Sequence, residues 1–162
     1  MMNDYNENYS IRKAVSDTVS LHTVEEITRD TIQEIYPHYY PKGAVEFFQS
    51  HHHADHILQD LKDGIVYLLF AGEQQAVGTI TLRNNEICRL FVLPEYQHKG
   101  YGRALMHFAE QKIYEQHRSC ILDASLPAKA IYLKRGYEIV KSCEIQTESG
   151  DVLCYDVMQK LA

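Results

Sequence analysis

The sequence predicts a single α/β (α+β) domain with a mixed, mostly antiparallel central sheet of about six or seven strands, one parallel step and about four flanking helices. Three observations lead to this fold class. The length of 162 residues fits one domain. Apolar residues follow a period of two in some segments and a helical period in others. Residues 86–124 form a strand–helix–strand unit, which implies parallel pairing through a right-handed crossover.

Local signals define each element in order. Strands are short apolar runs rich in β-branched and aromatic residues, and helices carry apolar residues three or four positions apart. Pro37 and Gly136 end helices. The predicted strands are residues 10–15, 64–71, 75–83, 86–93, 119–124, 137–145 and 152–159. The predicted helices are residues 17–36, 43–62 (broken near the histidines), 100–116 and 127–135.

The composition excludes several classes of protein. Sixteen basic and 22 acidic residues give a formal net charge of −6, and non-specific nucleic-acid binding needs a basic face instead. No apolar run approaches the ~20 residues of a membrane helix. Residues 1–9, which we expect to be flexible, lack the apolar core of a signal peptide. The four cysteines show no CxxC spacing, so we expect reduced thiols and a cytoplasmic protein. From the charge and the apolar runs, we expect no nucleic-acid or membrane partner.

One segment combines a strand, a glycine-bearing loop and the start of a helix. Gly100 and Gly102 allow the backbone to approach an anion closely, and the N–H groups that begin a helix attract negative charge. Lys99 and Arg103 add positive charge at the same place. These features predict a pyrophosphate site. The alternative is a loop whose glycines only close a turn. Neither the P-loop pattern nor GxGxxG is present.

Two motifs in this part of the chain carry a resemblance to a known family. Residues 97–102 read QHKGYG and follow VLPEY at 92–96, and residues 128–137 read AKAIYLKRGY. In this order and spacing they resemble the GNAT superfamily of N-acetyltransferases. The resemblance is strong over residues 77–140, the expected coenzyme-binding core of a single domain spanning 1–162. Residues 16–62 match only in being helical and are expected to form the acceptor side.

The resemblance implies direct transfer of an acetyl group from acetyl-CoA to a primary amine of a small molecule or peptide, without a metal. It places Leu90, Phe91 and Val92 along the pantetheine arm, with the N–H of Phe91 or Val92 polarising the thioester carbonyl. Ser125 stands where the family often has asparagine, and serine reaches less far. The loop residues implied to bind the coenzyme are Gln97, His98, Lys99, Gly100, Tyr101, Gly102 and Arg103.

The resemblance also suggests catalytic residues. Tyr132 matches a tyrosine near the thioester sulfur, where a phenol can protonate the departing thiolate; the alternative is a tyrosine that only packs. Glu86 matches a glutamate that some members use as general base. The alternatives are a solvated glutamate and a water chain that takes the proton. Period-two alternation predicts that Glu86, Cys88, Leu90 and Val92 share one face of their strand.

The acceptor side offers weaker indications. Two prolines bracket an aromatic loop, which we interpret as part of the acceptor pocket, although simple packing is the alternative; its candidate residues are Tyr36, His38, Tyr39 and Tyr40. His52 and His56 have the i,i+4 spacing of a chelating pair. We interpret the histidines around them as a polar helix break on the surface, and we expect no metal.

Two questions stay open at this level. A non-catalytic module that binds acyl-CoA and regulates a partner is the alternative to an enzyme. The final hairpin offers an exposed edge, so a homodimer is possible.

Overall fold

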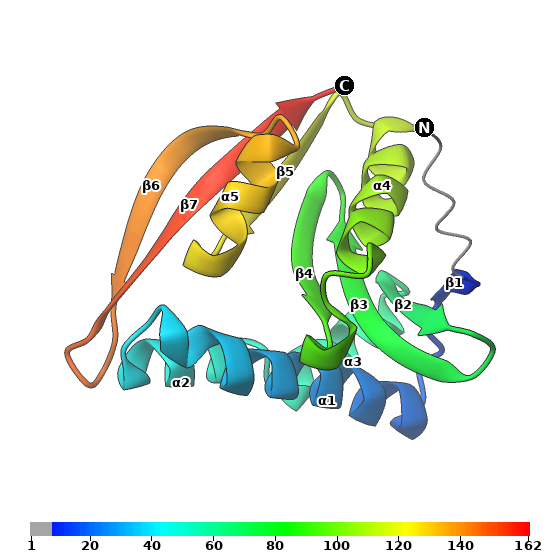
Figure 1. The fold of residues 1–162 in the computed structure, drawn as a ribbon, viewed down its shortest axis with the longest axis horizontal. Coiled ribbons are helices and arrows are strands. Elements are labelled where there is room, and N and C mark those ends of the chain that lie inside the picture. Colours follow the sequence, from blue (N-terminus) through cyan, green and yellow to red (C-terminus); the bar gives the residue numbers. More distant parts are fainter. Residues whose placement is uncertain (1–7) are drawn as a thin grey trace.

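The computed structural model describes residues 8–162, which form one seven-stranded sheet in the order β1-β2-β3-β4-β5-β7-β6 (Figure 1). The strands are β1 (Tyr9–Lys13), β2 (Val66–Ala71), β3 (Gln75–Arg83), β4 (Glu86–Val92), β5 (Ser119–Ala124), β6 (Glu138–Gln146) and β7 (Val152–Leu161). The helices are α1 (Thr18–Ile35), α2 (Lys42–His51), α3 (Ala54–Lys62), α4 (Tyr101–Tyr114) and α5 (Leu126–Lys134), with 3-10 turns η1 (Tyr36–His38) and η2 (Pro94–Tyr96).

The predicted fold class is confirmed. All neighbouring strands pair antiparallel except β4 and β5, which pair parallel and are joined through α4. The second predicted helix is two helices, because His52 ends α2 and His53 caps α3. The flexibility expected for residues 1–9 falls mostly outside the described residues, and Tyr9 already belongs to β1.

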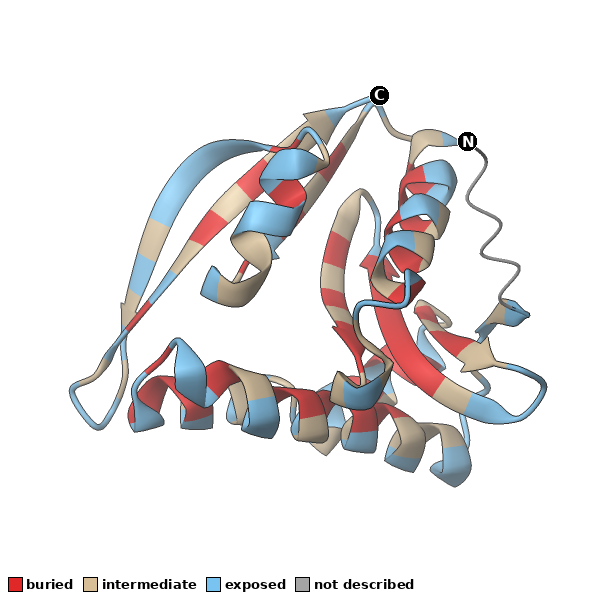
Figure 2. Cartoon of the chain, in the orientation of Figure 1, coloured by how far each residue is buried: buried red, intermediate tan, exposed pale blue. Residues whose placement is uncertain are grey.

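Helices cover both faces of the sheet and bury two apolar clusters. One cluster packs α4 against β3, β4 and β5, and the other packs α1, α2 and α3 against the opposite face. Figure 2 shows buried residues along β3, β4 and the inner sides of α1 and α4, whereas the edge strand β6 is mostly exposed. Burial of the two apolar faces supplies the main stabilisation of such a layered domain.

The turn between β6 and β7 reaches across to the first turn of α2 (Figure 1). The Gly43 N–H donates to the Asp151 carboxylate at 2.8 Å. A Cβ on Gly43 would overlap the Ser149 hydroxyl, so any other residue here would require the side chains of the turn to move. The hairpin therefore holds α2 in place from 108 residues further along the chain.

Strands β4 and β5 separate soon after they pair. Their parallel register extends only over Glu86–Ile87 and Ile121–Leu122, after which the two strands diverge (Figure 1). Such a separation leaves backbone groups on one edge of each strand without a partner strand. The divergence is the structural feature that opens the centre of the sheet.

A bulge in β4 changes which side chains face each side of the sheet. Cys88 is the extra residue where the register with β3 shifts. Ile87 therefore packs with Val92 beneath α4, while Arg89 and Phe91 face α1–α3. The predicted strict alternation along residues 86–92 is wrong for this reason, since Ile87 does not share a face with Arg89 and Phe91.

Candidate active site

A cavity of about 400 Å³ lies where β4 and β5 diverge. Its lining is mostly apolar and comes from β4–β7, α1, α2, α4 and α5. The predicted site residues that line it are Tyr36, Leu90, Phe91, Val92, Gln97, His98, Gly102, Ser125 and Tyr132. The predicted site residues outside its lining are His38, Tyr39, Tyr40, Glu86, Lys99, Gly100, Tyr101 and Arg103.

Backbone groups of β4 point toward this cavity. The Leu93 N–H donates to the Val77 carbonyl of β3 at 2.9 Å. In an antiparallel pair, residues whose N–H and C=O groups bond to the neighbouring strand alternate with residues whose groups point away from it. Since Leu93 bonds to β3, Leu90 and Val92 turn their N–H and C=O groups away from β3, toward the divergence. The Val92 carbonyl indeed accepts from the Gln97 side chain at 2.9 Å and from Thr31 at 3.2 Å. Of the two predicted N–H donors, Val92 rather than Phe91 therefore has the suitable direction.

The loop before α4 has the backbone shape of an anion site. His98 and Gly100 take left-handed conformations, with φ of 62° and 91°. Gly100 caps α4 without a side chain, and the Ala104 N–H is bonded back to its carbonyl at 3.0 Å. A Cβ at Gly100 or Gly102 would meet no atom within 4 Å, so the loop faces open space. This loop fits a phosphate group at a helix N-terminus.

The side chains around this loop divide into two groups. Lys99 and Arg103 are exposed, and the Lys99 ammonium lies 5.1 Å from the ring centre of Tyr96. Tyr101 is buried in the cluster beneath α4 and contacts the Tyr9 ring edge-on at 6.3 Å. Tyr101 therefore contributes to the loop through its backbone, while the two cations are available to an anion.

Tyr132 lies on α5 and lines the cavity from the side opposite β4. Its ring is buried and packs at 5.8 Å from the ring of Tyr137. Burial raises the pKa of the Tyr132 phenol, and the neighbouring Tyr36 adds to this shift. The phenol is therefore protonated at neutral pH and can act as a hydrogen-bond donor or a general acid.

Of the four aromatic-loop residues, only Tyr36 lines the cavity. Burial raises the pKa of its phenol, and a hydrogen bond with Ser125 opposes that shift. The Tyr40 hydroxyl accepts from the Leu126 N–H at 2.7 Å and donates to the Cys154 carbonyl at 3.1 Å, so Tyr40 fixes α5 and β7. His38 and Tyr39 are exposed outside the cavity.

The cavity also contains polar side chains that sequence reasoning missed; they are His51, His52, Cys88, Arg89 and Asp123. The histidines do form a helix break, but the prediction that this break is only a surface feature is wrong, because His51 and His52 line the cavity. His52 packs edge-on against Phe91 at 5.4 Å. Burial, reinforced by the Arg89 charge, lowers the pKa of His52 to about 3.

Glu86, the predicted general base, begins β4 beside the cavity and does not line it. Burial raises the pKa of its carboxyl group, and the negative charge of Asp123 raises it further. Its side chain forms no hydrogen bond or ion pair with the residues that the structure describes. An intervening water could connect Glu86 to a molecule bound in the cavity.

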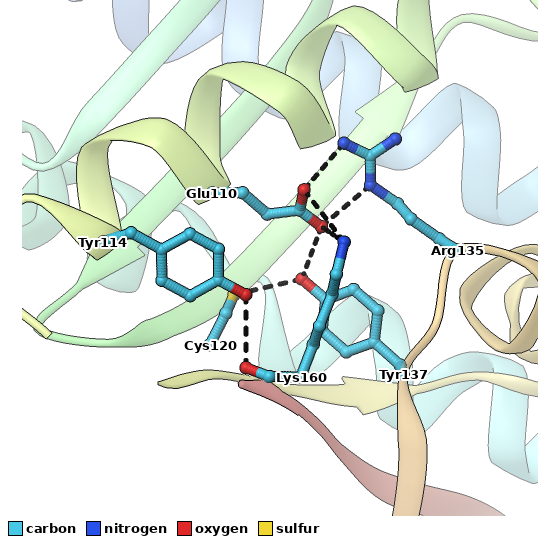
Figure 3. Close-up of polar contacts among 6 residues, drawn as sticks. All are labelled: Glu110, Tyr114, Cys120, Arg135, Tyr137 and Lys160. Atoms are coloured by element: carbon cyan, nitrogen blue, oxygen red, sulfur yellow. Dashed lines mark hydrogen bonds and ion pairs between the residues drawn. The ribbon is translucent and has the colours of Figure 1, made fainter. Parts of the chain in front are cut away.

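A buried network fixes the elements behind the cavity (Figure 3). The Glu110 carboxylate on α4 accepts two hydrogen bonds from Arg135, both at 2.8 Å, and one from the Tyr137 hydroxyl at 3.1 Å. The Lys160 ammonium lies 3.5 Å away. Burial alone would raise the pKa of Glu110, but Arg135 and Lys160 hold it below its usual value. The network ties α4 to the end of α5, the helix that carries Tyr132.

Within residues 8–162, no group of three or more His, Cys, Asp or Glu side chains is placed to hold a metal ion. No helix in that range is long and apolar enough to cross a membrane.

Comparisons with known proteins agree with this geometry. The chain matches the structure of a GCN5-related N-acetyltransferase from Rhodopseudomonas palustris with a TM-score of 0.84 and 19% identity, covering 94% of this chain and 95% of the other. It matches the PaiA N-acetyltransferase of Thermoplasma acidophilum, solved in complex with coenzyme A, with a TM-score of 0.74 and 22% identity over 96% and 99% of the two chains. A search of curated proteins finds no match.

At 19% and 22% identity, these two structures show a shared fold. Residues 35–150 match the family model described as "Acetyltransferase (GNAT) domain". This range includes the glycine loop, the diverging strands and Tyr132. The chain therefore belongs to the GNAT family of acetyltransferases.

Proposed function

We propose that this protein transfers the acetyl group of acetyl-CoA directly to a primary amine of a small molecule or peptide. One observation supports the proposal most strongly: the backbone of Leu90 and Val92 opens into the same cavity as Tyr132. That cavity also reaches the glycine loop through Gly102 and His98. An anion-binding loop, free strand edge and protonated phenol are what a coenzyme thioester requires for binding and activation.

Each residue has a distinct role in the proposed reaction. Bound acetyl-CoA would supply an activated acyl group as a thioester. The loop residues 97–103 would hold its pyrophosphate, and Leu90 would pair with the pantetheine arm. The Val92 N–H would stabilise the negative charge that develops on the carbonyl oxygen. As the amine nitrogen bonds to the carbonyl carbon and the carbon–sulfur bond breaks, Tyr132 would protonate the sulfur.

The nitrogen must also lose a proton. Glu86 stays a candidate for this step, acting through water, because it lies beside the cavity rather than in its wall. A chain of water molecules without Glu86 is the other route. The Glu86→Gln variant separates the two, since only the first route predicts a large loss of kcat at unchanged coenzyme affinity.

Release of free thiol from acetyl-CoA, measured over a panel of primary amines, tests the proposal. We expect amine-dependent thiol release together with coenzyme A binding by calorimetry. Binding of acetyl-CoA without turnover on any amine would favour a regulatory acyl-CoA-binding module. Absence of coenzyme binding would contradict both functions.

A further inference from the structure

Asp123 occupies a distinctive position on β5, directly after the last residue that pairs with β4. Its neighbours Cys120, Leu122 and Ala124 are buried in the cluster beneath α4. Because side chains alternate along a strand, Asp123 faces the opposite side of the sheet, where it lines the cavity. The carboxylate therefore lies at the fork of the two strands, on the acceptor side.

The Asp123 carboxylate has no partner among the residues that the structure describes. It forms no hydrogen bond or ion pair there, and it remains exposed at the open side of the cavity. Partial burial raises the pKa of its carboxyl group, and His51 opposes that shift. Glu86 lies close enough for the two negative charges to affect each other. This part of the cavity wall therefore carries uncompensated negative charge.

The other charged groups of the wall do not neutralise it. The Arg89 guanidinium donates to Asp60 at 3.1 Å and to Thr81 at 2.9 Å, so its charge is already paired. His52 has a pKa of about 3 and is neutral at physiological pH. A cationic ligand is therefore the natural partner for Asp123.

Beside these polar groups, most of the acceptor wall is apolar and aromatic. The Tyr36 and Phe48 rings pack edge-on at 4.7 Å, and Phe91 extends the same surface. Phe47 and Leu153 complete the wall from α2 and β7. An apolar pocket with one well-placed charged group fixes the orientation of a ligand that has both an apolar body and a charge.

We propose that the acceptor is a primary amine on an apolar body, bound as its ammonium ion by Asp123 with the body against the aromatic wall. Before the nitrogen attacks, the ammonium ion gives one proton to water, directly or on the way to Glu86, and the nitrogen loses its second proton by the same route as the amide forms. The inference rests on the proposed acetyl transfer and specifies its substrate class. Asp123 is then a specificity-determining residue that holds the nitrogen near the fork, where Val92 and Tyr132 meet the thioester.

Two isomeric amines test the role of charge. At neutral pH 2-phenylethylamine is an ammonium ion, whereas 4-ethylaniline has the same atoms and is uncharged. Loss of a hydrogen bond to a charged group predicts that Asp123→Asn lowers kcat/KM for 2-phenylethylamine roughly 10- to 100-fold, mainly through KM. The value for 4-ethylaniline should change less than about 3-fold, and Asp123→Glu should restore part of the loss.

The control is Asp55→Asn, which removes a carboxylate from the exposed start of α3 and should leave both amines unaffected. An equal loss for the two isomers, or no loss for 2-phenylethylamine, would overturn the inference. If wild-type protein binds coenzyme A but acetylates no amine, the proposed function fails. Calorimetry of 2-phenylethylamine with wild type and Asp123→Asn then decides the Asp123 site, since equal affinities would refute it.

Discussion

The proposed coenzyme side and the proposed acceptor side of the cavity are built from different parts of the chain and different kinds of group. The coenzyme side uses main-chain groups of one continuous segment, residues 90–103, together with Tyr132. The acceptor side uses side chains from α1, α2, β5 and β7, such as Tyr36, His52 and Asp123. A main-chain site depends on local backbone shape, whereas a side-chain site depends on how distant elements pack. Changes on the two sides should therefore have separable effects.

Gly100→Glu should give the largest effect, and only on the coenzyme side. A side chain at φ of 91° is strained, and its carboxylate would repel the pyrophosphate. Like charges placed together cost several kcal/mol, which predicts a loss of coenzyme A affinity of roughly 1,000-fold. Calorimetry measures the affinity. Gly72→Glu is the matched control, since Gly72 also has positive φ and open space but lies outside the cavity lining; equal losses would contradict the loop assignment.

Tyr132→Phe should separate chemistry from binding on the coenzyme side. Removal of a general acid predicts a fall in kcat of about 100-fold, while coenzyme A affinity stays nearly constant. Steady-state kinetics and calorimetry provide the two numbers. Tyr137→Phe is the control, because Tyr137 contacts the Tyr132 ring without lining the cavity and should keep its kcat. If kcat is unchanged in Tyr132→Phe, another group protonates the thiolate.

Glu110→Gln should weaken the support behind the coenzyme side. It leaves Arg135 and Lys160 without their carboxylate, and since both cations keep some exposure we expect a loss of about 2 kcal/mol in unfolding free energy. Urea denaturation measures it. Glu115→Gln makes the same chemical change at the exposed C-cap residue of α4 and should stay within about 0.5 kcal/mol. Similar losses in both would show that the network does not stabilise α4.

His52 should make the acceptor side sensitive to acid. Its folded pKa of about 3 lies below the value of about 6.5 in an unfolded chain. As pH falls from about 6.5 toward 3, the unfolded state binds the proton first, so stability falls by up to about 1.4 kcal/mol per pH unit. Urea denaturation at pH 7, 6 and 5 should show a smaller slope for His52→Gln. His38→Gln controls for the loss of an exposed histidine, and equal slopes in all three proteins would contradict the burial of His52.

The contrast between the two sides also explains what the sequence could and could not predict. The glycine loop and the order of elements follow from local signals, so the fold class and the backbone shape of the loop before α4 are predictable. The bulge at Cys88 has no local signature, and it reverses the expected direction of Ile87. The direction of the Asp123 side chain could have been predicted, because Leu122 and Ala124 on either side of it are apolar and mark the opposite, buried face of the strand. No sequence pattern predicts that His51 and His52 line the cavity, since their approach to β4 depends on how α2 packs.

The contact between the β6–β7 turn and α2 has a consequence for how the protein is made. A ribosome releases Gly43 108 residues before Asp151, the residue that holds it, and the whole glycine loop emerges between the two. The acceptor cavity also needs Leu153 and Tyr155. A nascent chain therefore contains the residues proposed to bind the coenzyme well before it can close the proposed acceptor pocket, so we expect any acetyl transfer to begin only when the last hairpin has formed.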